Sequence, residues 1–456
     1  MSATEFKFLT VDGHGRPLEP GSRASIRSRC MKGVNVRQGS RRSMRKARKA
    51  SHNASVLQEP TSSHQSASCE PLVKSLQLRT HELSFNSSPL PSTALRLVVK
   101  YNALLDATYP LERHLENADD NPIQRMNDYL TLLNENKILL ESIFLATYAV
   151  DDLCSGTKIS PRSQQSLCTI LSSLNNNLHR ASTQQSYSTI LIILILLFAA
   201  ESFQDFNAIT THLVGLRRLL ELRETKPVPM DSKLLFKIQQ VDLRTALATG
   251  RPLYFPFAYS YSQQPVGVTK PPRIMPWLMV HPNLMSCYQT LQALSTHANR
   301  HQASKIGPLL NWADFQSQVS TSQTHLIGLG SSQLPRGSEA LRLGMLAFLS
   351  TLSRSPAQKP RLPIFASQLE ECYFAMKREQ DPYMPLLIWL MLMGCISTID
   401  TSSSILSVWR YCVKPDLSWG DVRKMVGELP WIQMIHDEPG ERNYWLLQAR
   451  RGDGGS

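Results

Sequence analysis

The sequence has no closely spaced cysteines. Its 456 residues include eight cysteines, and no two of them form a Cys-x2-Cys pair. A Zn₂Cys₆ module needs six cysteines in two such halves, whereas the first 60 residues contain only Cys30. The spacing therefore excludes a zinc-stapled domain at this end of the chain. Scattered thiols in a chain of this length are typical of a reduced, intracellular protein.

The sequence also lacks an apolar run long enough to cross a bilayer. The most membrane-like stretch, residues 190–200, has eleven apolar residues, against the roughly 20 that a spanning helix needs. Glu201 and Asp205 follow directly, so we expect a helix that is buried on all sides and no membrane partner. The first residues lack the apolar segment of a signal peptide, and none is expected.

Motifs for catalysis and phosphate binding are missing as well. The chain has no GxxxxGK[ST], no GxSxG and no HExxH, and no GxGxxG follows a strand. His297 and His301 are spaced i, i+4 without an acidic or cysteine neighbour, which does not predict a metal site. His212 is expected to be a hydrogen-bonded helix residue. Residues 436–438, "HDE", are expected to be polar surface groups in a loop. We therefore predict no enzyme, no cofactor and no metal.

Acidic residues are absent from residues 20–58, where the positive charge is concentrated. The chain carries a net charge of +13, from 49 basic and 36 acidic residues. Removing the eleven basic residues of this stretch leaves 38 basic against 36 acidic, so the remainder is close to neutral. Such asymmetry predicts a polyanionic partner for the basic part of this stretch, which ends at about Ala50 and which we call the basic arm.

Ten basic residues of the arm are the candidate contacts for a nuclear import receptor or for DNA phosphates. They are Arg27, Arg29, Lys32, Arg37, Arg41, Arg42, Arg45, Lys46, Arg48 and Lys49; the eleventh basic residue is Arg23. Like charges at i, i+4 oppose a helix, so we expect an arm that is unstructured alone and becomes more helical when phosphates neutralise it. No aromatic residues are interleaved, which argues against stacking on single strands. Two interpretations stay open: an import signal alone, or import together with contact to the DNA phosphate backbone.

From residue 94 onward the apolar residues recur with helical periodicity, and strand signals are nearly absent. We predict an all-α fold: an N-terminal segment with the basic arm (1–50), a disordered Ser/Pro-rich linker (51–93), one large multi-helix domain (94–448) and a flexible tail (449–456). Residues 251–277, with six prolines, are expected to form a long ordered loop. Predicted helices include 126–153, 284–296, 338–353, 365–377, 385–406 and 419–429, the last with a capping box at Ser418 and Asp421.

Four stretches resemble one known family. The start "FKFLTVDGHGRPLEPGSRASIRSRCMKG" is similar to an aromatic start followed by an "IRSHVM" box, which Ile26, Arg27, Ser28 and Met31 match. Arg29 and Cys30 depart from that box. Residues 211–223, 241–256 and 419–445 resemble later segments of the same proteins.

In this order, the stretches resemble the fungal-specific transcription-factor-domain proteins, in the branch without a zinc cluster. The resemblance implies an all-helical regulatory domain in a nuclear transcriptional regulator, for example of a specialised metabolite pathway. It also implies DNA, other transcription factors or a second copy of the chain as partners. The alternative is a nuclear co-regulator or interaction protein that does not touch DNA, whose basic arm is only a nuclear localisation signal.

Overall fold

The computed structural model describes residues 90–112, 115, 122–156, 159–180, 183, 186–223, 231–256, 281–304, 311–354, 359–378, 383–400, 403–414 and 416–450. Within these residues the fold consists of α-helices and short 3-10 turns, and it has no strand, so the all-α prediction is confirmed. The first described helix begins at Ser92. The basic arm, nearly all of the predicted linker and the last six residues lie outside the described part.

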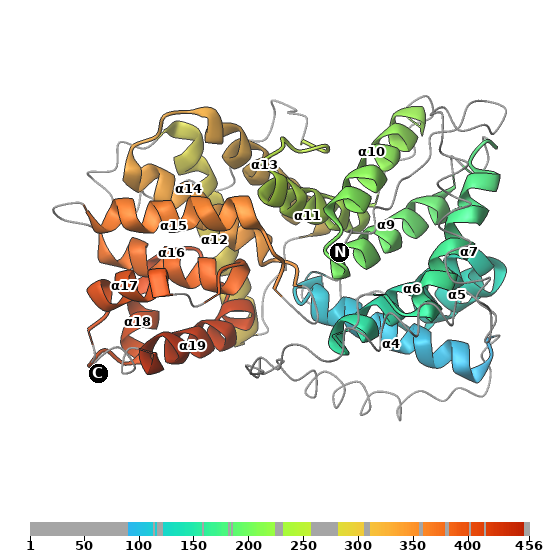
Figure 1. Ribbon diagram of the computed structural model, residues 1–456, viewed down its shortest axis with the longest axis horizontal. Helices are drawn as coiled ribbons and strands as arrows, with labels where there is room; N and C mark the ends of the chain where they lie inside the picture. Colours follow the sequence, from blue (N-terminus) through green and yellow to red (C-terminus); the bar gives the residue numbers. More distant parts are fainter. Residues whose placement is uncertain are drawn as a thin grey trace, which may run out of the picture.

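The N-terminal group of helices packs on the right in Figure 1. It comprises α4 (Ser92–Thr108), α5 (Pro122–Glu135), α6 (Lys137–Cys154), α7 (Pro161–Asn177), α9 (Tyr187–Ser202) and α10 (Phe206–Arg223). The central helix is α9, whose Ile192 and Ile195 enter one apolar cluster while Ile193 and Leu197 enter another. The prediction of a helix buried on all sides is therefore confirmed. None of the helices in the described ranges is both long and apolar enough to span a membrane.

The prediction of one long helix over residues 126–153 is wrong, because the helix is interrupted at Asn136. This residue has φ −116° and caps α6, with its side-chain oxygen accepting a hydrogen bond from Leu139 N at 3.0 Å. An asparagine side chain that satisfies a free N–H at a helix start competes with continuation of the preceding helix. Apolar periodicity runs through both helices and does not reveal this break.

The C-terminal group of helices packs on the left in Figure 1. It comprises α12 (Pro282–Ser304), α13 (Trp312–Gly328), α14 (Arg336–Ser350), α15 (Pro363–Lys377), α16 (Met384–Ser397), α17 (Ser403–Cys412), α18 (Trp419–Met425) and α19 (Gln433–Ala449), with 3-10 turns at Leu329–Ser331 and Val426–Glu428. Helix α16 is the core of this group, with Leu386 through Cys395 buried. The predicted capping box of Ser418 and Asp421 is present at the start of α18.

The single helix predicted over 385–406 is also wrong, since α16 and α17 are separate. Thr398 leaves the helical region at φ −152°. Its hydroxyl donates to Pro360 O at 3.0 Å and accepts from Leu362 N at 3.1 Å. These contacts join segments far apart in the sequence, so the break depends on tertiary structure that local periodicity does not contain.

The prediction that residues 436–438 lie in a loop is wrong as well. They belong to α19, and His436 is fully buried against the rings of Trp431 and Phe348. His436 Nδ1 accepts from Ile432 N at 2.9 Å, and Nε2 lies 2.8 Å from Thr351 Oγ1. That hydroxyl donates to Phe348 O at 2.6 Å, so the imidazole is neutral with its proton on Nε2. Burial lowers the pKa of His436 well below its ordinary value.

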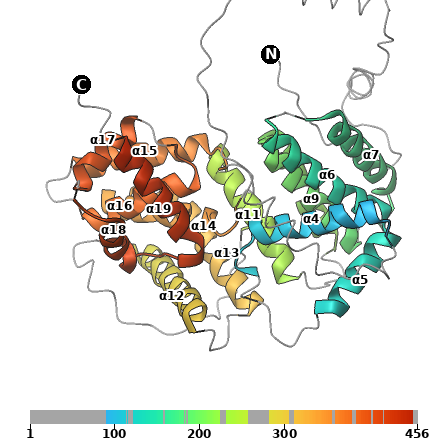
Figure 2. The ribbon, with the colours of Figure 1, turned by 90° about the horizontal axis from the view of Figure 1, so that it is seen from below.

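Helix α11 (Ser232–Thr249) lies between the two groups, as Figures 1 and 2 show. It contacts α9 and α10 on one side and α13, α14 and α15 on the other. Asp231 caps its start, and Gly250 ends it in the left-handed conformation at φ 69°, which glycine adopts without strain. Thirteen of its residues are buried, including the charged Asp242 and Arg244.

Candidate functional site

A cavity of about 640 Å³ lies between α4, α5, α6, α9 and α11. Its apolar wall is made of Leu105, Leu139, Ile143, Leu191, Leu194, Ile195, Phe198, Leu234 and Val241. Small-molecule sites in proteins are clefts or cavities of roughly 300–1,000 Å³ with mostly apolar walls and a few polar groups. The size and wall of this cavity match that description, which makes it the candidate site of the described chain.

Phenol groups provide much of the polar part of the wall. Tyr101 on α4, Tyr109 just beyond it and Tyr129 on α5 line the cavity, and Tyr187 lines it from the start of α9. Burial raises the pKa of Tyr101, and the nearby Tyr129 and Tyr109 raise it further. Burial also raises the pKa of Tyr109 and Tyr129. All three phenols are therefore protonated at neutral pH and can donate hydrogen bonds.

Charged residues of both signs complete the lining. Lys237 of α11 forms an ion pair with Glu112, with Nζ 3.1 Å from Oε2, and the two side chains are 15% and 21% exposed. The same ammonium lies 5.0 Å from the centre of the Tyr109 ring, within cation–π range. The other charged residues in the lining are Asp106, Asp231 and Lys233. Three carboxylates thus face two ammonium groups, and one ammonium is already neutralised by its partner.

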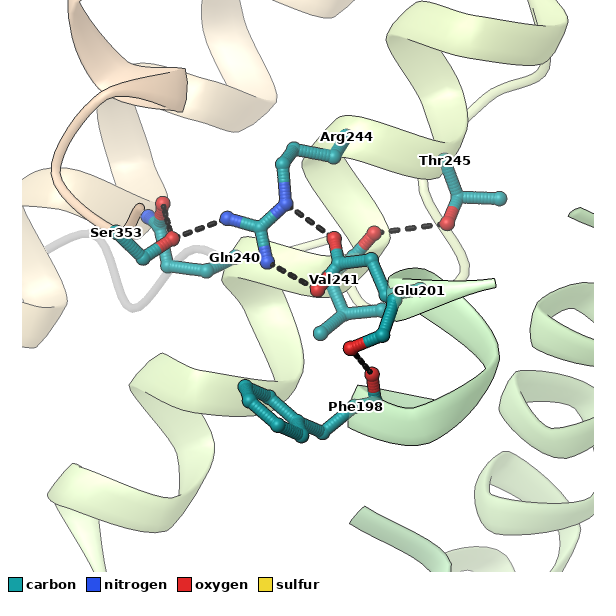
Figure 3. Close-up of polar contacts among 8 residues, drawn as sticks. Phe198, Glu201, Gln240, Val241, Arg244, Thr245 and Ser353 are labelled. Carbon is teal, nitrogen blue, oxygen red and sulfur yellow. Dashed lines mark hydrogen bonds and ion pairs between the residues drawn. The ribbon is translucent and has the colours of Figure 1, made fainter. Parts of the chain in front are cut away.

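A buried ion pair lies one helical turn from the cavity wall. Figure 3 shows the Arg244 guanidinium between Glu201 and Ser353. Arg244 donates from Nε and Nη2 to the two carboxylate oxygens of Glu201, the second contact at 2.8 Å, and from Nη1 to Ser353 Oγ. Ser353 Oγ donates to Gln240 Oε1 at 3.2 Å. We call these four residues the Arg244 junction, because they connect α9 and α11 with the segment that follows α14.

The junction adjoins the cavity through its sequence neighbours. Glu201 follows the lining residue Phe198 by three positions on α9, and Arg244 follows the lining residue Val241 by three positions on α11. Residues three apart lie on the same face of a helix. Burial lowers the pKa of Arg244, but Glu201 and, to a smaller extent, Tyr109 more than compensate, so the pKa is raised overall. The guanidinium therefore stays charged although its side chain is only 6% exposed.

Asp242 fixes the turn that follows α11. Its two carboxylate oxygens accept from Tyr254 N at 3.0 Å and from Phe255 N at 2.8 Å. Burial raises the pKa of Asp242 to about 6, and these two hydrogen bonds oppose that rise. Residues 251–256 of the predicted long loop are thereby held against α11. The rest of that loop lies outside the described residues.

One cysteine and histidine contact was not foreseen from the sequence. Cys287 Sγ of α12 lies 3.8 Å from His325 Nδ1 of α13. Burial raises the pKa of the Cys287 thiol to about 12, whereas a nucleophilic cysteine needs a lowered thiol pKa. The Cys287 thiol is therefore a packed core group and not an activated nucleophile. The 38 positions between the two residues leave no local signal for it.

The structure places the other sequence candidates as follows. The ten basic residues proposed for import or DNA contact all lie outside the described residues. His212 is buried in α10, where burial lowers its pKa to about 3, so it is neutral. His297 lies on α12, and within the described ranges no group of three His, Cys, Asp or Glu could hold a metal ion.

Among the described residues, the cavity lining contains no serine, cysteine or histidine. Sequence analysis missed it because its walls come from five helices spread over residues 101–241. Each of these tyrosines and leucines, taken alone, resembles an ordinary core residue.

No protein-family model, no curated protein sequence and no solved structure matches this chain. The resemblance to fungal-specific transcription-factor-domain proteins is therefore still a prediction from the sequence.

Proposed function

We propose that this chain is a nuclear transcriptional regulator, in which the basic arm mediates import and contacts DNA phosphates while the helical body carries a regulatory site. The observation that supports this proposal is the separation of charge. Eleven basic and no acidic residues lie within residues 20–58, while the rest of the chain is close to neutral. The arm therefore has the charge needed to bind a polyanion. The near-neutral body contains a ligand-sized cavity and can carry the regulatory site. A specialised metabolite pathway as the target is a part of this proposal that rests on the resemblance alone.

The direct test is an electrophoretic mobility shift with the full chain and random-sequence duplex DNA at low salt. Deletion of residues 23–49 should abolish the shift. The matched control deletes residues 60–86, a stretch of equal length with two basic and two acidic residues, and should retain it. If about eight cations contact phosphates, log K should fall with log[salt] at a slope of roughly −7. Absence of a shift by the full chain at low salt would refute DNA contact by the arm.

The chain has no zinc-cluster cysteines, which favours one second candidate: a co-regulator that enters the nucleus but reaches DNA through a partner. The two functions differ in cells. Replacing Arg41, Arg42, Arg45 and Lys46 while adding a foreign import signal should lower chromatin occupancy if the arm contacts DNA. Unchanged occupancy under those conditions would favour the co-regulator.

A further inference from the structure

We propose that the cavity between α4, α5, α6, α9 and α11 binds a neutral, largely apolar small molecule that carries hydrogen-bond acceptors. This inference concerns the helical body alone and holds whether or not the arm contacts DNA. The cavity volume of about 640 Å³ corresponds to a drug-sized ligand. Nine apolar side chains in the wall supply the contact surface, and removing apolar surface from water drives such binding.

The charges of the lining argue for a neutral ligand. Lys237 is paired with Glu112 at 3.1 Å, and Asp106 and Asp231 are further carboxylates in the lining. An anionic ligand would meet three carboxylates against two ammonium groups. The Lys237 ammonium would become available to it only if the existing ion pair with Glu112 separated. A neutral ligand leaves that pair intact and incurs no such cost.

The phenols argue for acceptor atoms on the ligand. Tyr101, Tyr109 and Tyr129 come from two helices and the turn between them, yet all line one cavity. Because burial raises the pKa of each phenol, these groups keep their protons and offer donors rather than anions. A ligand carbonyl, ether or hydroxyl oxygen can accept from them. Polar groups of this kind, few in number and set in an apolar wall, fix the orientation of a ligand.

The first experiment uses two fluorescent probes with the same ring skeleton. N-phenyl-1-naphthylamine is neutral, and 1-anilinonaphthalene-8-sulfonate adds one negative charge. Titration of the full chain should show saturable binding of the neutral probe and at least tenfold weaker binding of the sulfonate. Absence of saturable binding of the neutral probe would overturn the site. Equal affinity for both probes would overturn its preference for a neutral ligand.

Variants then locate the probe. Leu194→Trp fills the cavity from α9 at a partly buried position, and Asn102→Trp does so from α4 without removing a core side chain. Either should weaken the neutral probe at least tenfold. Val214→Trp is the control, since Val214 is 49% exposed on α10 and does not line the cavity. Melting temperatures identify any variant that fails to fold. If one cavity variant fails to fold, the other one tests whether the probe binds in the cavity. Equal affinities in a folded cavity variant and the control would place the probe elsewhere and overturn the proposal.

A second probe tests the phenols. Nile red has a carbonyl oxygen that N-phenyl-1-naphthylamine lacks. Tyr129→Phe removes one partly buried hydroxyl while keeping the ring. This change, or Tyr101→Phe, should weaken Nile red by about two- to tenfold, the range for one lost hydrogen bond. The affinity for N-phenyl-1-naphthylamine should stay the same. If neither variant weakens Nile red, the tyrosines do not select acceptor atoms.

Discussion

Replacing Arg244 with methionine tests whether the buried ion pair holds the two helix groups together. In the native chain the guanidinium satisfies both carboxylate oxygens of Glu201 and the hydroxyl of Ser353. The side chains of Arg244 and Glu201 are 6% and 17% exposed, so water does not readily replace the lost partner. Arg244→Met therefore leaves a carboxylate largely buried without its cation.

The expected loss is about 3–5 kcal/mol in the free energy of unfolding, the usual cost of removing one member of a buried pair. The matched control is Arg217→Met, which removes an arginine from an i, i+4 pair with Glu221 on α10. Both members of that pair are more than half exposed, and exposed pairs contribute about 1 kcal/mol or less. The double variant Arg244→Met with Glu201→Met should recover most of the loss, because no buried charge then stays unpaired.

Urea unfolding followed by far-UV circular dichroism gives these free energies, and melting temperatures give the same order if unfolding is irreversible. For a folded part of about 300 residues, 3–5 kcal/mol corresponds to about 5–8 °C. Equal losses for Arg244→Met and Arg217→Met would refute the argument from burial. A double variant that is less stable than Arg244→Met would show that Glu201 has another role.

Two further predictions concern packing and pH. Gly344 of α14 faces the ring of Trp389 at a distance that leaves no room for a Cβ, so Gly344→Ala should lower the melting temperature by several degrees. Gly328→Ala, at a helical position with open space, should be neutral or stabilising by up to about 1 kcal/mol. His436 is neutral when folded and has a lowered pKa, so below the unfolded value of about 6.5 only the unfolded chain gains its proton. Stability should therefore fall by about 1.4 kcal/mol per pH unit from this residue. Between about pH 6.5 and pH 5, the free energy of unfolding of His436→Gln should decline less steeply than that of the wild-type chain, by that amount per pH unit. An equal slope for the two chains would contradict the assignment of a neutral, buried His436.

Local sequence signals predicted the features of the fold that local chemistry controls. The helical class, the buried helix α9 and the Ser418 capping box follow from apolar spacing and from side-chain to backbone hydrogen bonds within a few residues. The break at Asn136 has a local signal too, since asparagine favours helix starts. Apolar periodicity alone does not reveal this break, because it continues through both helices. The break at Thr398 has no such signal, because its partners come from the segment before α15.

The candidate site could not be predicted from the sequence for a related reason. Its lining residues are ordinary core residue types, and their only unusual property is that packing leaves space between them. Space between helices depends on how the helices cross, which no residue determines alone. Arg244 shows the same limit, since Ser353 lies 109 positions away. A charged residue in an apolar face of α11 could have indicated a buried pair, but not its partners.

Helix α11 connects the cavity to the Arg244 junction, and this allows the two to be tested together. A ligand that binds only the folded chain stabilises it by about 2.7 kcal/mol at 100 times its Kd. Arg244→Met removes the hydrogen bond between Arg244 and the lining residue Tyr109 but none of the apolar side chains of the wall, so N-phenyl-1-naphthylamine at that excess should restore most of the stability that the variant loses. The same concentration should not stabilise Leu194→Trp, whose cavity is filled. The probe could instead raise the free energy of unfolding of Arg244→Met by much less than it raises that of the wild-type chain. That result would show that the junction itself shapes the cavity. A changed probe affinity in Arg244→Met would then measure the coupling between the two, which is reciprocal.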